Sequence, residues 1–65
     1  MKTIEMLKNE KYYAPLYDLI EDELDKWSKA CGWRVLTEER YVDAMGWIAK
    51  SWDVDVNALR AYYED

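Results

Sequence analysis

Residues 48–64 read Ile48-Ala49-Lys50-Ser51-Trp52-Asp53-Val54-Asp55-Val56-Asn57-Ala58-Leu59-Arg60-Ala61-Tyr62-Tyr63-Glu64. This stretch predicts the end of one helix, a tight corner and a second short helix. Asp53 suits the corner because aspartate tolerates a left-handed backbone better than most residues. Asp55 is a favourable N-cap for the helix that follows, Val56–Glu64. The apolar residues of that helix fall on one side of it, so we expect the corner to close a helical core.

A longer helix is expected over Pro15–Cys31. Proline suits the first turn of a helix, where no backbone N–H is required, and Gly32 is a natural C-terminal stop. At about 100° per residue, the apolar side chains share a narrow arc: Leu16, Ile20, Leu24, Trp27 and Cys31. Cys31 is therefore interpreted as a small buried apolar residue rather than as a reactive thiol.

A second long helix is expected over Glu38–Ser51, with Thr37 as its N-cap. Its apolar face carries Tyr41, Met45, Ile48 and Trp52. Gly46 lies inside the helix at a cost of about 1 kcal/mol relative to alanine, which indicates that another helix approaches closely there. Trp47 projects away from the apolar face. It either anchors a partner, as tryptophan often does at interfaces, or packs against the N-terminal segment.

The remaining segments have weaker patterns. Thr3 is a suitable cap for a short helix over Ile4–Asn9, and the link Trp33–Leu36 is expected to pack without joining a sheet. Tyr12 and Tyr13 carry the same two interpretations as Trp47. Together these patterns predict an all-α fold, a compact three- to four-helix domain over residues 1–65 that ends in a helix-turn-helix-like corner. Residues 1–13 have the weakest pattern of the chain.

The inventory of residues argues against catalysis and metal binding. The chain has 65 residues, one cysteine and no histidine, so no intrachain disulfide can form and the usual zinc ligands are lacking. No glycine-rich loop and no serine–base arrangement is visible. We therefore expect no enzymatic activity, no cofactor and no metal. A lone reduced cysteine fits the cytoplasm, and the apolar runs fall far short of the ~20 residues that cross a bilayer.

The distribution of charge favours a protein partner. The formal net charge is −5, from 14 acidic and 9 basic residues, and no basic cluster is present. A negative field repels nucleic acid and attracts basic partners. Four acids form a stripe on the outer side of the Pro15–Cys31 helix, and together with Trp47 they are the candidate partner surface: Asp18, Glu21, Asp22 and Asp25. The alternative interpretation of the stripe is a solvated helix face.

The C-terminal stretch resembles the helix-turn-helix of MerR-type regulators. The similar residues are Ile48-Ala49-Lys50, Val54-Asp55-Val56, Leu59-Arg60 and Tyr62-Tyr63, with Asp53 at a position where that family usually has glycine. The resemblance implies that the second helix enters the major groove of DNA. Asn57 and Arg60 would then face base edges, because asparagine reads adenine and arginine reads guanine. Lys50 would lie further back, toward phosphate.

These features are compatible with three functions. The favoured hypothesis is a small non-catalytic regulator or inhibitor, of the kind that a phage or other mobile element encodes, which acts by contact with a protein. The first alternative is a DNA-binding transcriptional regulator that uses the helix-turn-helix. The second is a structural or assembly protein that forms homo-oligomers through its aromatic residues, which include four tryptophans and six tyrosines.

Overall fold

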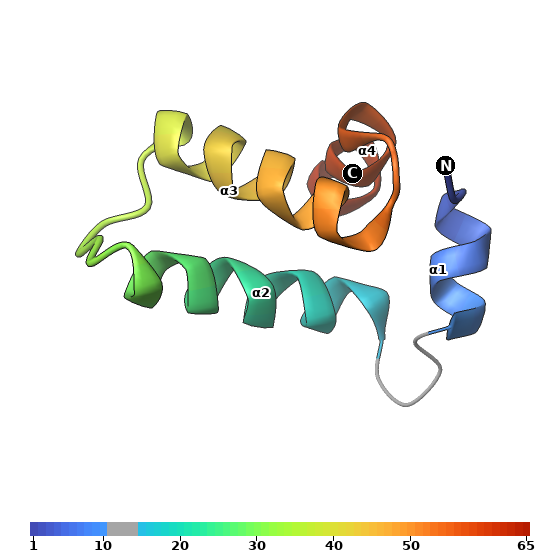
Figure 1. The fold of residues 1–65 in the computed structure, drawn as a ribbon, viewed down its shortest axis with the longest axis horizontal. Helices are drawn as coiled ribbons and strands as arrows, with labels where there is room; N and C mark the ends of the chain where they lie inside the picture. The colour runs from blue at the N-terminus through green and yellow to red at the C-terminus, as the bar shows by residue number, and fades with distance from the viewer. Residues whose placement is uncertain (11–14) are drawn as a thin grey trace.

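Four helices make up the part of the chain that the computed structural model describes, residues 1–10 and 15–65. They are α1 (Ile4–Glu10), α2 (Leu16–Ala30), α3 (Glu38–Trp52) and α4 (Val56–Glu64). Figure 1 shows α2 and α3 side by side in opposite directions, with α4 near the C-terminal end of α3 and α1 beside α4. The described residues form no strand, and the predicted all-α fold is confirmed. Tyr12 and Tyr13 lie outside the described residues.

The core lies where the four helices meet. Every helix contributes at least one side chain that is less than 2% exposed, and the largest of these are Leu7, Ile20, Met45, Ile48 and Leu59. Half-buried aromatic residues pack around them, among them Trp27, Trp33 and Tyr63. Burying one large aliphatic side chain contributes about 1.5–3 kcal/mol relative to leaving it exposed. The apolar stripes of the helices therefore supply one shared core.

Local capping sets the ends of the longer helices. Thr37 Oγ1 accepts a hydrogen bond from the Arg40 backbone N–H at 3.3 Å, at the start of α3. Asp55 Oδ2 accepts one from the Ala58 N–H at 3.1 Å, at the start of α4. Gly32 follows α2 with a positive φ of 72°, a conformation that glycine adopts without steric cost. Both predicted caps and the predicted stop are confirmed.

A left-handed corner joins α3 to α4. Asp53 has φ 56° and ψ 49°, as expected for the residue that turns the chain. The Val54 N–H donates to the Ala49 carbonyl at 2.9 Å, and the Val54 side chain is 5% exposed. The corner thus fixes α4 against the core. That it serves as a DNA-binding helix-turn-helix stays a prediction.

The N-terminal segment is fastened to this corner. The Lys2 N–H donates to the Asp53 carbonyl at 2.6 Å, and Lys2 and Val54 form a parallel bridge. Thr3 Oγ1 accepts from the Met6 N–H at 3.2 Å and caps α1 as predicted. One turn further on, Leu7 is fully buried. A short helix therefore closes the side of the core that the corner leaves open.

The interpretation of Cys31 as a buried apolar residue is wrong, because its side chain is exposed. The helix ends at Ala30, so Cys31 is already the C-cap and the apolar arc of α2 does not continue to it. Trp33 closes this end of the core instead. The backbone N–H of Trp33 donates to the Ser28 carbonyl at 2.9 Å, and Ser28 Oγ donates to the Trp33 carbonyl at 3.2 Å. The rest of the link is more open than expected, since Val35 is 66% exposed.

Gly46 also departs from expectation. A Cβ built on Gly46 would meet nothing within 4 Å, so no helix of the described chain approaches it closely.

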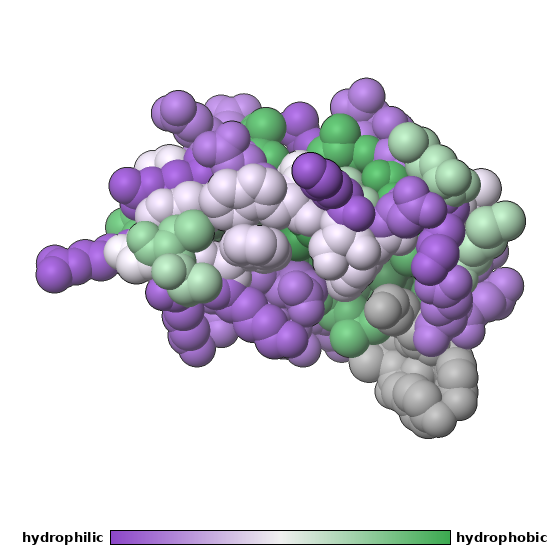
Figure 2. Space-filling view, viewed as in Figure 1, coloured by the Kyte–Doolittle hydropathy of each residue, from purple (hydrophilic) through white to green (hydrophobic). Residues whose placement is uncertain are grey.

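Figure 2 shows one face of the molecule, on which hydrophilic side chains surround a pale band of residues of intermediate hydropathy. Among the described residues, no helix combines the length and the apolar character that crossing a membrane requires.

Candidate functional site

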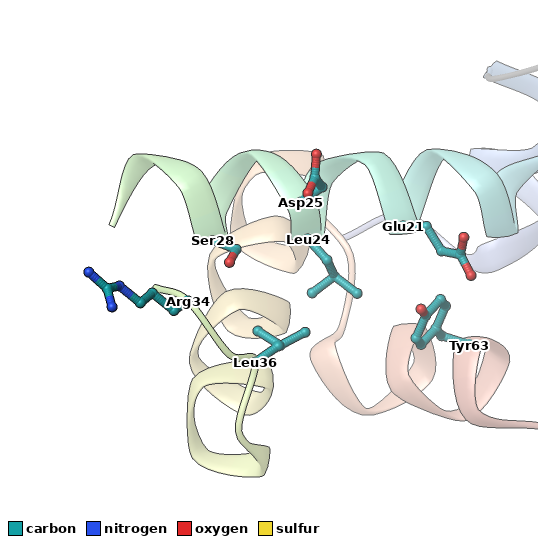
Figure 3. Close-up of a pocket in the computed structure, with 7 residues that line it drawn as sticks. All are labelled: Glu21, Leu24, Asp25, Ser28, Arg34, Leu36 and Tyr63. Atoms are coloured by element: carbon teal, nitrogen blue, oxygen red, sulfur yellow. The ribbon is translucent and has the colours of Figure 1, made fainter. Parts of the chain in front are cut away.

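A surface groove of about 360 Å³ lies between α2, the link before α3 and the end of α4. Figure 3 shows Leu24 and Leu36 facing one another across it, with Glu21 near the ring of Tyr63 at one end. Arg34 lies at the opposite end, and its side chain extends away from the groove. The residues that line the groove are Glu21, Leu24, Asp25, Ser28, Arg34, Leu36 and Tyr63.

The groove is assembled from three segments by simple local rules. Glu21, Leu24 and Ser28 share one flank of α2, because residues three, four and seven apart lie above one another on a helix. Leu36 directly precedes the cap of α3. Tyr63 lies in the last turn of α4, where its ring stacks on Tyr17 with 4.7 Å between centroids. The three segments thus form an apolar floor, with the Glu21 carboxylate beside it and Asp25 at the rim.

Glu21 is the acid best placed to meet a ligand. Its carboxylate makes no hydrogen bond or ion pair with the described residues. Its charge lies close enough to Tyr63 to act on that phenol. Burial, then the neighbouring Tyr17 and then the negative charge of Glu21 raise the pKa of Tyr63. A negative charge that no described residue pairs with, beside an apolar floor, is available to a cation from outside the chain.

The other three acids of the predicted stripe lie mainly outside the groove. Asp18 and Asp22 are exposed and make no ion pair with described residues. Lys26, one turn after Asp22, pairs with Glu23 at 3.2 Å. Asp25 lines the rim, but it pairs with Lys29 at 3.0 Å and Figure 3 shows its carboxylate turned away from the floor. The structure therefore brings two acids of the four to the groove, Glu21 beside its floor and Asp25 at its rim, and leaves Asp18 and Asp22 on the solvated side of α2.

Trp47, the fifth residue of the candidate partner surface, lies on another side of the molecule. Its ring contacts Trp27 at 4.7 Å and Trp33 at 6.1 Å between centroids. It thus packs against α2 and the link, which corrects the expected packing against the N-terminal segment. Trp27 lies about 180° around α2 from Asp18. The acidic stripe and Trp47, which is 41% exposed, consequently do not form one surface.

The three candidate nucleic-acid contacts lie in different surroundings. Arg60 Nε lies 2.9 Å from Glu64 Oε2, and its guanidinium lies 5.7 Å from the centre of the Tyr41 ring. Asn57 is exposed on α4. Lys50 is exposed on α3 and borders a hollow with Trp27 and Trp47. Among these three candidates, only Lys50 offers a positive charge that no acid of the described residues neutralises.

Sequence reasoning missed a polar network that ties α3 to α4. The Tyr41 hydroxyl donates to Glu64 Oε2 at 2.7 Å, across 23 residues of sequence. Burial, and then the hydrogen bond to Glu64, raise the pKa of Tyr41 to about 12. The hydrogen bonds from Tyr41 and then from Arg60 lower the pKa of Glu64. The network joins Arg60 and Glu64 to Tyr41 at the partly exposed junction of α3 and α4.

The network predicts a late step in the titration of the tyrosines. Because the folded chain holds the pKa of Tyr41 above the ordinary value near 10, its contribution to stability is complete below pH 10. It is lost as the pH rises from 10 toward 12. We expect the near-ultraviolet absorbance of tyrosinate to show a step near pH 12 that Tyr41→Phe removes and Tyr17→Phe retains. A late step that survives Tyr41→Phe would contradict this assignment.

No metal centre is evident in the part of the chain that the structure describes, where acidic and cysteine side chains form no group of three able to hold an ion. Comparisons of the chain with protein-family models, curated proteins and solved structures found no match. The groove beside Glu21 is therefore interpreted on its own chemistry.

Proposed function

We propose that the chain is a small non-catalytic binding protein that contacts a basic segment of another protein, and that the groove beside Glu21 is the contact site. The observation that carries the proposal is the Glu21 carboxylate, which makes no ion pair with the described residues and lies beside the apolar floor of Leu24, Leu36 and Tyr63. A long cationic side chain has matching parts, since its stem is apolar and its head is charged. Arginine or lysine next to an apolar residue is the occupant that this groove fits.

The two ends of the groove differ in charge, which favours one direction of binding. Glu21 attracts a cation at the Tyr63 end, whereas the positive charge nearest the Leu36 end is that of Arg34, whose side chain extends away from the groove. The bound segment is therefore oriented with its cation at Tyr63 and its apolar part over Leu24. The net charge of −5 adds a weaker, longer-ranged attraction for basic partners. A role in regulation or inhibition would follow from covering a basic surface of the partner.

A labelled peptide tests the proposal. The peptide carries one arginine between leucines and has blocked ends, and its matched control carries neutral citrulline in place of arginine. We expect the arginine peptide to bind more tightly, with an affinity that falls as salt rises. Glu21→Gln should weaken binding by about tenfold, because a hydrogen bond to a charged group contributes ~1.5–3 kcal/mol. Fluorescence anisotropy measures both affinities.

Asp22→Asn is the matched control variant. Asp22 is the next residue on α2 and is exposed without an ion pair in the described chain, but it does not line the groove. It should leave the affinity within a factor of about two, since the local contact outweighs screened charge. Equal losses in the two variants would show that the acidic stripe acts as a diffuse field and that the groove is not the site. Duplex DNA bound in preference to the peptide would favour the DNA-binding alternative.

A further inference from the structure

The outer face of α3 carries a glycine that the fold of the described chain does not explain. Gly46 lies in the middle of a helix of 15 residues, where glycine destabilises by about 1 kcal/mol relative to alanine. A side chain at this position would have open space around it, since nothing lies within 4 Å of a Cβ built there. Neither a turn nor a close contact within the described residues requires glycine at this position. The close approach of another molecule to this face of α3 would require it.

Opposite charges flank Gly46 on the same face. Asp43 lies one turn before it and Lys50 one turn after it, and both are exposed. Neither makes an ion pair with the described residues. Trp47, 41% exposed, lies beside Gly46 and borders a shallow hollow of about 330 Å³ with Trp27, Lys50 and Ser51. The face thus consists of an acid, a gap, an exposed indole and a base.

This order of residues is complementary to itself. When two copies of α3 lie antiparallel about the Gly46–Trp47 bond, Asp43 of each copy faces Lys50 of the other. Trp47 of each copy then faces the gap at Gly46. A two-fold interface uses the same patch on both subunits, so every contact forms twice. A second copy of the chain carries the complementary residues at the required spacing, so it is the occupant that this face specifies.

We propose that a second copy of this chain docks on the α3 face formed by Asp43, Gly46, Trp47 and Lys50, as an antiparallel dimer. The contact is confined to one helix of about 22 Å, so it falls among small interfaces and the dimer is weak. The groove beside Glu21 contains no residue of α3. The dimer and the proposed binding function therefore depend on different residues and can be tested independently.

Charge-swapped variants test the dimer by sedimentation equilibrium. Asp43→Lys makes the face wholly basic and Lys50→Asp makes it wholly acidic, so each variant alone should be monomeric, with a dissociation constant raised by at least about tenfold. An equal mixture of the two variants should form a heterodimer. The double variant Asp43→Lys with Lys50→Asp restores self-complementarity and should dimerise again. Circular dichroism verifies that each variant keeps its helical content.

Two further variants separate the face from the total charge and from the aromatic surface. Asp22→Lys makes the same change of charge on α2 and should dimerise like the parent chain. Gly46→Gln fills the gap and should abolish the dimer, although it favours the isolated helix. A parent chain that stays monomeric to millimolar concentration would overturn the proposal. So would a mixture of Asp43→Lys and Lys50→Asp that fails to associate while the parent chain dimerises.

Discussion

Leu59→Ala is expected to lower the free energy of unfolding by about 2–5 kcal/mol, the usual cost of deleting a buried leucine side chain. Leu59 is fully buried, and it is the one buried residue of α4. A chain of 65 residues has a total stability of only about 3–10 kcal/mol at the usual value per residue. The variant should therefore be unfolded in a large part of the population at 25 °C. Urea denaturation followed by circular dichroism measures the loss.

Asn57→Ala provides the control on the same helix. Asn57 is exposed, and a surface substitution usually changes stability by no more than about 0.5 kcal/mol. If Leu59→Ala costs no more than this control, then α4 does not pack on the core as described. The pair separates the packing of α4 from its intrinsic preference for helix, since both variants introduce alanine.

Leu7→Ala is expected to release α1 from the rest of the fold, with a cost of about 2–4 kcal/mol. α1 has seven residues, and Leu7 is its one buried side chain. A helix this short does not persist without tertiary contacts, so loss of Leu7 should also melt it. Hydrogen exchange should then become fast at the Lys2 amide, which donates to Asp53 in the folded chain.

Met6→Ala is the matched control for α1. Met6 precedes Leu7 and has a side chain of similar size, but it is 52% exposed. Its replacement should leave the protection of the Lys2 amide nearly unchanged. Equal effects of the two substitutions would mean that α1 is held by its backbone contacts with the corner rather than by Leu7.

The parts of the fold that depend on neighbouring residues could be predicted from the sequence. Thr37, Asp55 and Gly32 act on backbone groups within a few residues of themselves, so their side chains alone predict helix ends. Asp53 could be placed in the corner for the same reason. The periodicity of α2 and α3 also identified their buried faces, because the stripe of a helix follows from its pitch.

The end of α2 shows where periodicity fails. Extending the apolar arc to Cys31 assumed that the helix and the core end together. The helix ends one residue earlier, and Trp33 returns to cover that end of the core. Whether Trp33 takes the place expected for Cys31 depends on the path of the link. The apolar pattern of one helix carries no information about that path.

The groove could be predicted only in part. Glu21 was among the candidates because it lies on the exposed side of α2, but nothing in the helix distinguishes it from Asp18 or Asp22. The distinction arises from Leu36 and Tyr63, which other segments bring to Glu21. One local signal was present, since an apolar residue just before an N-cap, as Leu36 is, often packs back on the first turns of its helix.

Binding in the groove beside Glu21 is tested most directly by mapping amide chemical shifts as the arginine peptide is added to the isotopically labelled protein. We expect the largest shifts to cluster at Glu21, Leu36 and Tyr63. The citrulline peptide should leave these amides nearly unchanged, and Glu21→Gln should abolish the shifts. Shifts spread evenly along the acidic side of α2, or concentrated on α4 at Asn57 and Arg60, would contradict the assignment of the groove as the binding site.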